Sequence, residues 1–217
     1  MKDPLSTYWA KRLDQTAEAL DDNGFDVFRA DDEEAVRRVA LSEILPALEP
    51  RVIGLGGSLS VIQCGLYQAL KEFPGLELLD TYDKALPESE KLEMRRQALL
   101  SDLFVCGVNA LTEAGQLVNL DMIGNRVGAL AFGPKNVLVL AGRNKIVPDL
   151  AAAMRRVKDL AAPLNTMRLN KKTPCVKAAR CLDCKSPDRI CNVWTITEKS
   201  FPKGRIKVIL VDRDLGL

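Results

Sequence analysis

The chain has 217 residues, of which 47% are hydrophobic and 28% charged, a composition typical of a globular protein. Its 31 basic and 29 acidic residues give a net charge of +2, which predicts neither a nucleic acid nor a membrane partner. Histidine is absent, and this excludes the commonest acid–base group near neutral pH and every histidine-containing metal site. Because neither a transmembrane run nor a secretory signal is visible, we expect a cytoplasmic protein with reduced cysteines.

The first elements expected along the chain are two helices. Asp3-Pro4 combines a capping residue with proline at the first helical position, and Asn23-Gly24 supplies a stop signal. Asp31 resembles the start of a capping box for a second helix, which we expect Pro46 and Pro50 to end.

Short apolar runs alternate with helical patterns over the rest of the chain. Strands are expected at 51–55, 76–79, 103–108, 127–132, 137–141 and 206–211, with helices after Ser58, over 87–100 and from Pro148. This alternation predicts an α/β layered domain with a largely parallel central sheet. A change to basic residues, prolines and cysteines divides the chain into this domain at 1–162 and a four-cysteine segment with a closing strand, packed on the same domain, at 163–217.

A glycine-rich turn follows the strand expected at 51–55. Glycines allow close approach of the backbone to an anion, and a serine can cap the helix that follows. The candidate ligand-binding residues of this turn are Gly54, Gly56, Gly57 and Ser58. The third glycine of a dinucleotide fingerprint and the lysine of a phosphate-binding loop are missing, so no nucleotide cofactor is predicted. The alternative interpretation is a tight turn with a serine cap and no ligand.

The polar stretch 109–126 and the later Lys145 offer hydrogen bonds and positive charge to a small anionic ligand. The candidates are Asn119, Asp121, Asn125, Arg126 and Lys145. The alternative is that these residues only build turns, as Asn, Asp and Gly often do.

Glu113 follows the apolar strand 103–108, where partial burial would raise its pKa towards a value useful in catalysis. It is therefore the candidate catalytic base or nucleophile.

Several motifs together resemble the lactate utilization (LUD) domain family. They are Thr112-Glu113-x-Gly115-x-Leu117-Val118-Asn119-x-Asp121, Gly124-Asn125-Arg126-Val127, Gly133-Pro134 and Gly142-x-Asn144-Lys145-Ile146-Val147. The resemblance implies a fold like that of sugar-phosphate isomerases and coenzyme A transferases, with Glu113 matched to a working carboxylate and Gly133 added to the candidate site. It also implies a role in bacterial L-lactate oxidation beside iron–sulfur redox partner proteins. The short length and the cysteine segment depart from the larger members of that family.

Four cysteines lie close together as Cys-x5-Cys-x2-Cys-x6-Cys, at Cys175, Cys181, Cys184 and Cys191. Four thiolates can bind zinc or hold an iron–sulfur cluster, and the basic residues around them would stabilise either centre. The alternatives are a redox-active dithiol and four reduced structural thiols. Cys64 and Cys106 stand alone, and we expect them in the core.

Three functions remain open from the sequence. The leading one is a component of organic-acid oxidation, such as a subunit of an oxidoreductase complex, that binds an organic acid or a phosphorylated ligand and relays electrons through an iron–sulfur centre. The second is a stand-alone enzyme acting through Glu113 on a small anionic carbonyl, acyl or sugar-phosphate substrate. The third is a zinc-stabilised module that binds nucleic acid or an acidic protein.

Overall fold

The computed structural model describes residues 3–217. Its centre is a six-stranded sheet in which every neighbouring pair of strands is parallel. In spatial order the strands are β1 (Asp26–Ala30), β10 (Ile206–Val211), β7 (Asn136–Gly142), β4 (Leu103–Gly107), β2 (Val52–Leu55) and β3 (Glu77–Leu79). The predicted α/β class with a largely parallel sheet is confirmed.

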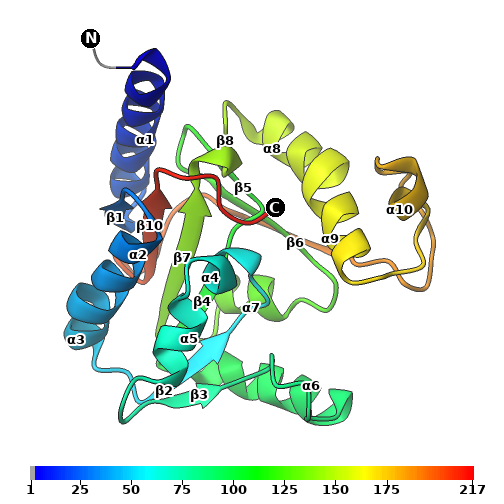
Figure 1. The fold of residues 1–217 in the computed structure, drawn as a ribbon, viewed down its shortest axis with the longest axis horizontal. Helices are drawn as coiled ribbons and strands as arrows, with labels where there is room; N and C mark the ends of the chain where they lie inside the picture. Colours follow the sequence, from blue (N-terminus) through cyan, green and yellow to red (C-terminus); the bar gives the residue numbers. More distant parts are fainter. Residues whose placement is uncertain (1–2) are drawn as a thin grey trace.

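Helices cover both faces of this sheet (Figure 1). One face packs against α2 (Glu33–Val39), α3 (Leu45–Leu48), α4 (Leu59–Gln63) and α5 (Leu66–Lys71). The other face packs against α1 (Pro4–Asp22), α6 (Glu88–Gln97) and α7 (Asn125–Ala131). Strand β4 shows why both faces need cover. Leu103 and Val105 belong to the first core, and Phe104 and Cys106 to the second, because successive strand residues point to opposite faces.

A second, smaller sheet extends from the end of β4. It contains β8 (Ile146–Val147), β5 (Ala110–Thr112), β6 (Leu117–Asp121) and β9 (Val193–Thr197), in that order. Beyond it lie α8 (Leu150–Arg156), α9 (Ala162–Arg168) and α10 (Pro174–Ala178), on the side away from α1 to α3 (Figure 1). Within residues 3–217, none of the helices has both the length and the apolar character needed to cross a membrane.

Several local predictions are confirmed. The side chain of Asp3 caps α1 by accepting from the Ser6 amide at 2.9 Å, and Asn23 ends that helix. Ser58 caps α4 by accepting from the Val61 amide at 3.3 Å. Cys64 and Cys106 are fully buried, as expected for core residues.

Other local predictions are wrong. Residues 127–132 belong mainly to helix α7 instead of a strand, because the Asp121 carboxylate accepts from the backbone amides of Arg126 and Val127 and so caps a helix there. The cap of α2 is Asp32, one residue after the predicted Asp31. Strands β1 and β9 were not expected at all, because neither shows a long apolar run.

Pro46 does not end the second helix, because a π-helical turn precedes this proline. The π-helical turn Ala40–Ile44 lies immediately before α3, which contains Pro46 near its start. The π-helical turn Val157–Ala161 stands in the same relation to Pro163 in α9. A π-helical turn shifts the hydrogen-bond register by one residue, which gives a residue without an N–H a place in the helix. The boundary drawn at 162/163 therefore falls inside a continuous helical stretch.

Asp102 joins the amino-terminal ends of three strands of the large sheet. Its carboxylate accepts from Lys135 Nζ at 2.7 Å and from the amides of Arg51 and Val52 at 3.0 and 3.1 Å. These interactions, the Lys135 hydrogen bond first, lower the pKa of Asp102 to about 2.

We predict that Asp102→Asn lowers the free energy of unfolding by roughly 1 to 2 kcal/mol at pH 7. Because the folded-state pKa lies below the unfolded value, this contribution is complete above about pH 4 and is lost as the pH falls towards 2. Urea unfolding of both proteins at pH 7 and pH 3 measures it. An equal loss at both pH values would show that the carboxylate charge is not the cause.

Candidate functional site

A large pocket with a volume of about 700 Å³ opens at the carboxyl ends of the parallel strands. Residues that follow β2, β3, β4, β7 and β10 all contribute to its wall. Ligands of open α/β sheets bind at this edge, since the loops there converge and backbone groups point into the crevice. The structure brings together six of the residues predicted from the sequence: Gly57, Ser58, Asp121, Asn125, Arg126 and Lys145.

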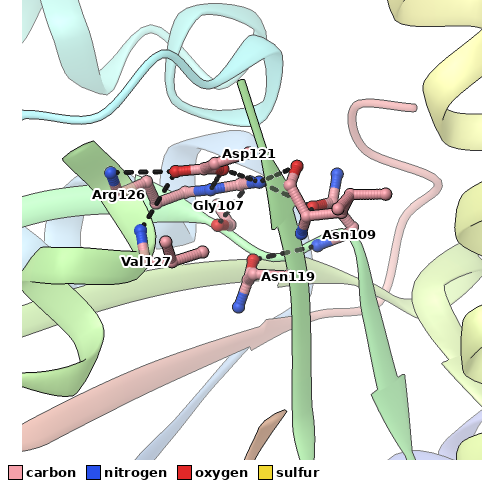
Figure 2. A network of polar contacts seen from close by, with 7 residues as sticks. Gly107, Asn109, Asn119, Asp121, Arg126 and Val127 are labelled. Atoms are coloured by element: carbon pink, nitrogen blue, oxygen red, sulfur yellow. Dashed lines mark hydrogen bonds and ion pairs between the residues drawn. The ribbon is translucent and has the colours of Figure 1, made fainter. Parts of the chain in front are cut away.

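Asp121 and Arg126 form a buried ion pair in the wall of this pocket (Figure 2). Arg126 Nη2 lies 2.6 Å from Asp121 Oδ1, and Nε donates to the same oxygen at 2.9 Å. The guanidinium also donates to the Asn109 side chain at 2.6 Å and to the Gly107 carbonyl at 3.3 Å. With its donors occupied and its charge balanced by Asp121, Arg126 shapes the wall and supplies little net charge to a ligand.

Lys145 has a different environment. Its side chain is 3% exposed, and Nζ donates to Ser60 Oγ at 2.8 Å. Among residues 3–217 no carboxylate forms an ion pair with it. Burial, followed by repulsion from Arg156 and Arg126, lowers the pKa of Lys145 to about 7. The pocket thus contains an amine that exchanges its proton near neutral pH.

The pocket wall also contains cations that the sequence analysis did not assign to the site. They are Arg95, Arg168 and Lys171, from α6, the end of α9 and the residues after it. Neither Arg168 nor Lys171 has an ion-pair partner among residues 3–217, and Arg95 lies 3.8 Å from Glu88. Apart from the basic run that begins near Arg168, no local pattern could have identified them, because only the fold brings α6 and α9 to one pocket.

The glycine turn is built mainly for packing. A Cβ on Gly54 would lie 2.7 Å from Ala98 Cβ, and one on Gly56 would lie 2.9 Å from Cys106 Cβ. Neither glycine lines the pocket, although Gly57 and Ser58 do. The Ser58 amide donates to Tyr82 Oη at 2.8 Å, so that amide already has a partner.

Three further candidates lie outside the pocket. Glu113 sits on the turn between β5 and β6, where it pairs with Arg12 at 2.7 Å, with 40% of its side chain exposed. Asn119 is buried and accepts a hydrogen bond from the backbone amide of Asn109, a residue of the pocket wall, at 3.3 Å. Gly133 has φ of 137° and lies against Leu99, where it forms a turn. A catalytic role for Glu113 stays a prediction from the sequence.

All four clustered cysteines line one small cavity of about 20 Å³. Arg189 organises this segment by donating to the Cys184 and Cys191 carbonyls at 2.6 and 2.9 Å. The Cys175 thiol lies 3.3 and 3.1 Å from the hydroxyls of Thr166 and Thr173. Within residues 3–217, no three acidic or cysteine side chains stand in a ligating arrangement, so metal binding would require the thiols to turn towards the shared cavity. Ile190 lines both this cavity and the large pocket.

The fold and the pocket define an α/β protein with a cationic pocket at the carboxyl edge of a parallel sheet. A model of the LUD domain matches residues 13–211, and the chain belongs to that family, which is associated with lactate utilization. The matched residues include the four cysteines. No curated protein matches the chain.

One solved structure shares this fold over almost the whole chain. A DUF162 family protein from Deinococcus radiodurans is 15% identical, with a TM-score of 0.50, over 94% of this chain and 98% of that one. D-ribose-5-phosphate isomerase in complex with phospho-erythronic acid is 19% identical, with a TM-score of 0.31, over 54% of this chain and 56% of that one. The structure of eIF2B delta from Chaetomium thermophilum is 15% identical, with a TM-score of 0.30, over 56% of this chain and 55% of that one.

The Lys145 environment predicts an unusual dependence of stability on pH. Between about pH 7 and the unfolded-state pKa near 10.5, the unfolded chain holds a proton that the folded protein has lost, so the free energy of unfolding should rise with pH. Lys145→Met should abolish this rise, whereas Lys172→Met, at an exposed position, should keep it. Urea unfolding from pH 6.5 to 10 measures the free energy of unfolding of the wild type and of the two variants as a function of pH. Parallel curves for the wild type and Lys145→Met would contradict the prediction.

Proposed function

We propose that this LUD domain protein binds a small organic carboxylate in its large pocket and acts as a component of organic-acid oxidation. The observation that carries the proposal is the charge of the pocket wall. Its five cationic side chains are Arg95, Arg126, Lys145, Arg168 and Lys171. Among residues 3–217, the acidic side chains that line this wall are Glu88 and Asp121, and Asp121 is committed to Arg126.

This imbalance favours an anion of small size. Arg168 and Lys171 can attract a carboxylate from solvent, and the concave wall concentrates their field. Lys145, whose amine is partly protonated near pH 7, adds to the positive charge of the wall. L-lactate and pyruvate suit the association of the family with lactate utilization.

We predict that calorimetry at pH 7 detects binding of L-lactate or pyruvate and finds the neutral lactamide at least about tenfold weaker, equivalent to about 1.4 kcal/mol. Arg168→Gln should weaken carboxylate binding by a similar factor, while Lys172→Gln, which lies outside the pocket, should leave it unchanged. Ribose 5-phosphate serves as the phosphorylated comparison. Lactamide binding as tightly as lactate would overturn the proposal.

The second part of the proposal is a metal centre held by Cys175, Cys181, Cys184 and Cys191. The fit rests on the convergence of all four thiols at one cavity and on the cationic Lys158 and Arg189 in its wall. Four thiolates around zinc carry a net charge of −2, which these cations would offset. When bound, an iron–sulfur cluster would supply electron transfer and zinc would supply structural order.

Two observations favour different metals. A cavity of about 20 Å³ holds an object the size of one water molecule, which suits a single zinc ion without rearrangement. The association of the family with lactate utilization suits a redox centre. The metal centre that we propose first is therefore an iron–sulfur cluster that relays electrons. Ile190, which separates the two cavities, would place such a relay next to the bound carboxylate.

We predict that protein purified without oxygen contains stoichiometric iron and sulfide or stoichiometric zinc, measured by metal analysis and absorption spectroscopy. Cys181→Ser with Cys184→Ser should abolish it, and Cys64→Ala, at a buried cysteine outside the cavity, should not. Hydrogen exchange of the metal-free protein should then show faster exchange over residues 170–192 and an unchanged large sheet. Equal protection of the segment with and without metal would contradict this part of the proposal.

A further inference from the structure

One reactive group in the large pocket serves the proposal above only through its charge. The Lys145 amine lines the pocket but is buried, and its hydrogen-bond partner is a hydroxyl instead of a carboxylate. A lysine in an ion pair is held as the ammonium form, which has no lone pair. The neighbours of Lys145 favour the neutral amine instead, because Arg156 and Arg126 both lie near enough to repel a positive charge.

We propose that Lys145 is a nucleophilic lysine, which condenses with the carbonyl of an α-keto acid bound in the pocket and forms a Schiff base. The inference rests on the proposed carboxylate site and names the chemical class and the reacting atom within it. The rim cations Arg168 and Lys171 would bind the carboxylate of such a substrate, and the deeper amine would meet its carbonyl carbon.

The amine is held in place by two elements that are distant in sequence. Lys145 follows β7, and Ser60 lies in α4 after the glycine turn, with the two side-chain atoms 2.8 Å apart. The Ser60 hydroxyl in turn lies 3.4 Å from the Leu215 carbonyl. Restricting the amine in this way lowers the entropy lost on reaching an attacking geometry.

The backbone at Gly216 packs directly over this pair. A Cβ there would lie 2.4 Å from Ser60 Oγ and 3.1 Å from Lys145 Nζ, and φ is +72°. Any side chain at 216 would therefore displace the hydroxyl and the amine from each other. The contact also keeps water away from the amine, which is what favours the neutral, nucleophilic form.

The chemistry balances without an oxidant or reductant. The nitrogen lone pair of the neutral amine attacks the carbonyl carbon, and a C–N bond forms. The carbonyl oxygen then leaves as water, taking the two protons that the amine nitrogen carried. Ser60, which touches the nitrogen, is placed to pass a proton from nitrogen to oxygen. The product is an imine that links Lys145 to the α-carbon of the acid.

The test traps this imine in the intact wild-type protein. Pyruvate and sodium borohydride are added together at pH 7.5, and intact mass spectrometry with peptide mapping locates the reduced adduct. We expect one adduct per chain, on Lys145, and none when L-lactate, which has no carbonyl, replaces pyruvate. Lys145→Met should remove the adduct, while Lys171→Met, at a lysine on the rim of the same pocket, should retain it with weaker pyruvate binding.

The rate of adduct formation tests whether Ser60 positions the Lys145 amine. Ser60→Ala should slow adduct formation by about tenfold or more, equivalent to about 1.4 kcal/mol in the barrier, with pyruvate binding within twofold of the wild type. Loss of pyruvate affinity with an unchanged trapping rate would overturn that role.

Two outcomes separate this inference from the proposed function. If calorimetry shows pyruvate binding but borohydride traps nothing, or traps lysines other than Lys145, the Schiff base is wrong and the carboxylate site stands. If pyruvate neither binds nor is trapped while the wild-type protein is folded by circular dichroism, both are wrong.

Discussion

The arrangement of the pocket depends on one carboxylate, that of Asp121. One of its oxygens caps α7 through two backbone amides, and the other receives the Arg126 guanidinium. Arg126 in turn joins the end of β4 to β6 through the carbonyls of Gly107 and Leu120. A buried ion pair of this kind tolerates removal of neither partner, since the remaining charge would be left without compensation. This polar cluster therefore holds β6 and α7 against the end of β4 in the large sheet.

The electrostatics of the pocket follow from where charges are paired and where they are not. Arg126 is balanced by Asp121, and Arg143 is balanced by Asp212 and Asp214, which follow β10. Lys145 is buried and lies among cations without such a balance, and its burial, followed by their repulsion, lowers its pKa to about 7. An anionic ligand would supply the negative charge that this part of the pocket lacks, as in the carboxylate site that we propose.

The cysteine segment forms part of the same architecture. It leaves α9, contributes Ile190 to both cavities and returns as β9, the edge strand of the small sheet. The chain then crosses to β10 in the interior of the large sheet. A change in the order of this segment would thus be felt in the pocket wall, because Leu169 and Lys171 line the pocket from its start. Ile190, which lines both cavities, is the direct contact between this segment and the pocket wall.

The sequence by itself determined the features whose causes are local or periodic. Asp3 and Ser58 are caps because each side chain reaches an amide three residues away, and β4, β7 and β10 are recognisable because a strand buried on both faces is continuously apolar. Residues 127–132 were mistaken for a strand because the carboxylate that caps α7 belongs to the preceding strand β6. Only the tertiary structure decided which cations share a pocket, since Arg95, Lys145 and Arg168 come from separate elements. The tertiary structure alone also decided the pKa of Lys145, because burial and the absence of an acidic partner among residues 3–217 are properties of the packed chain.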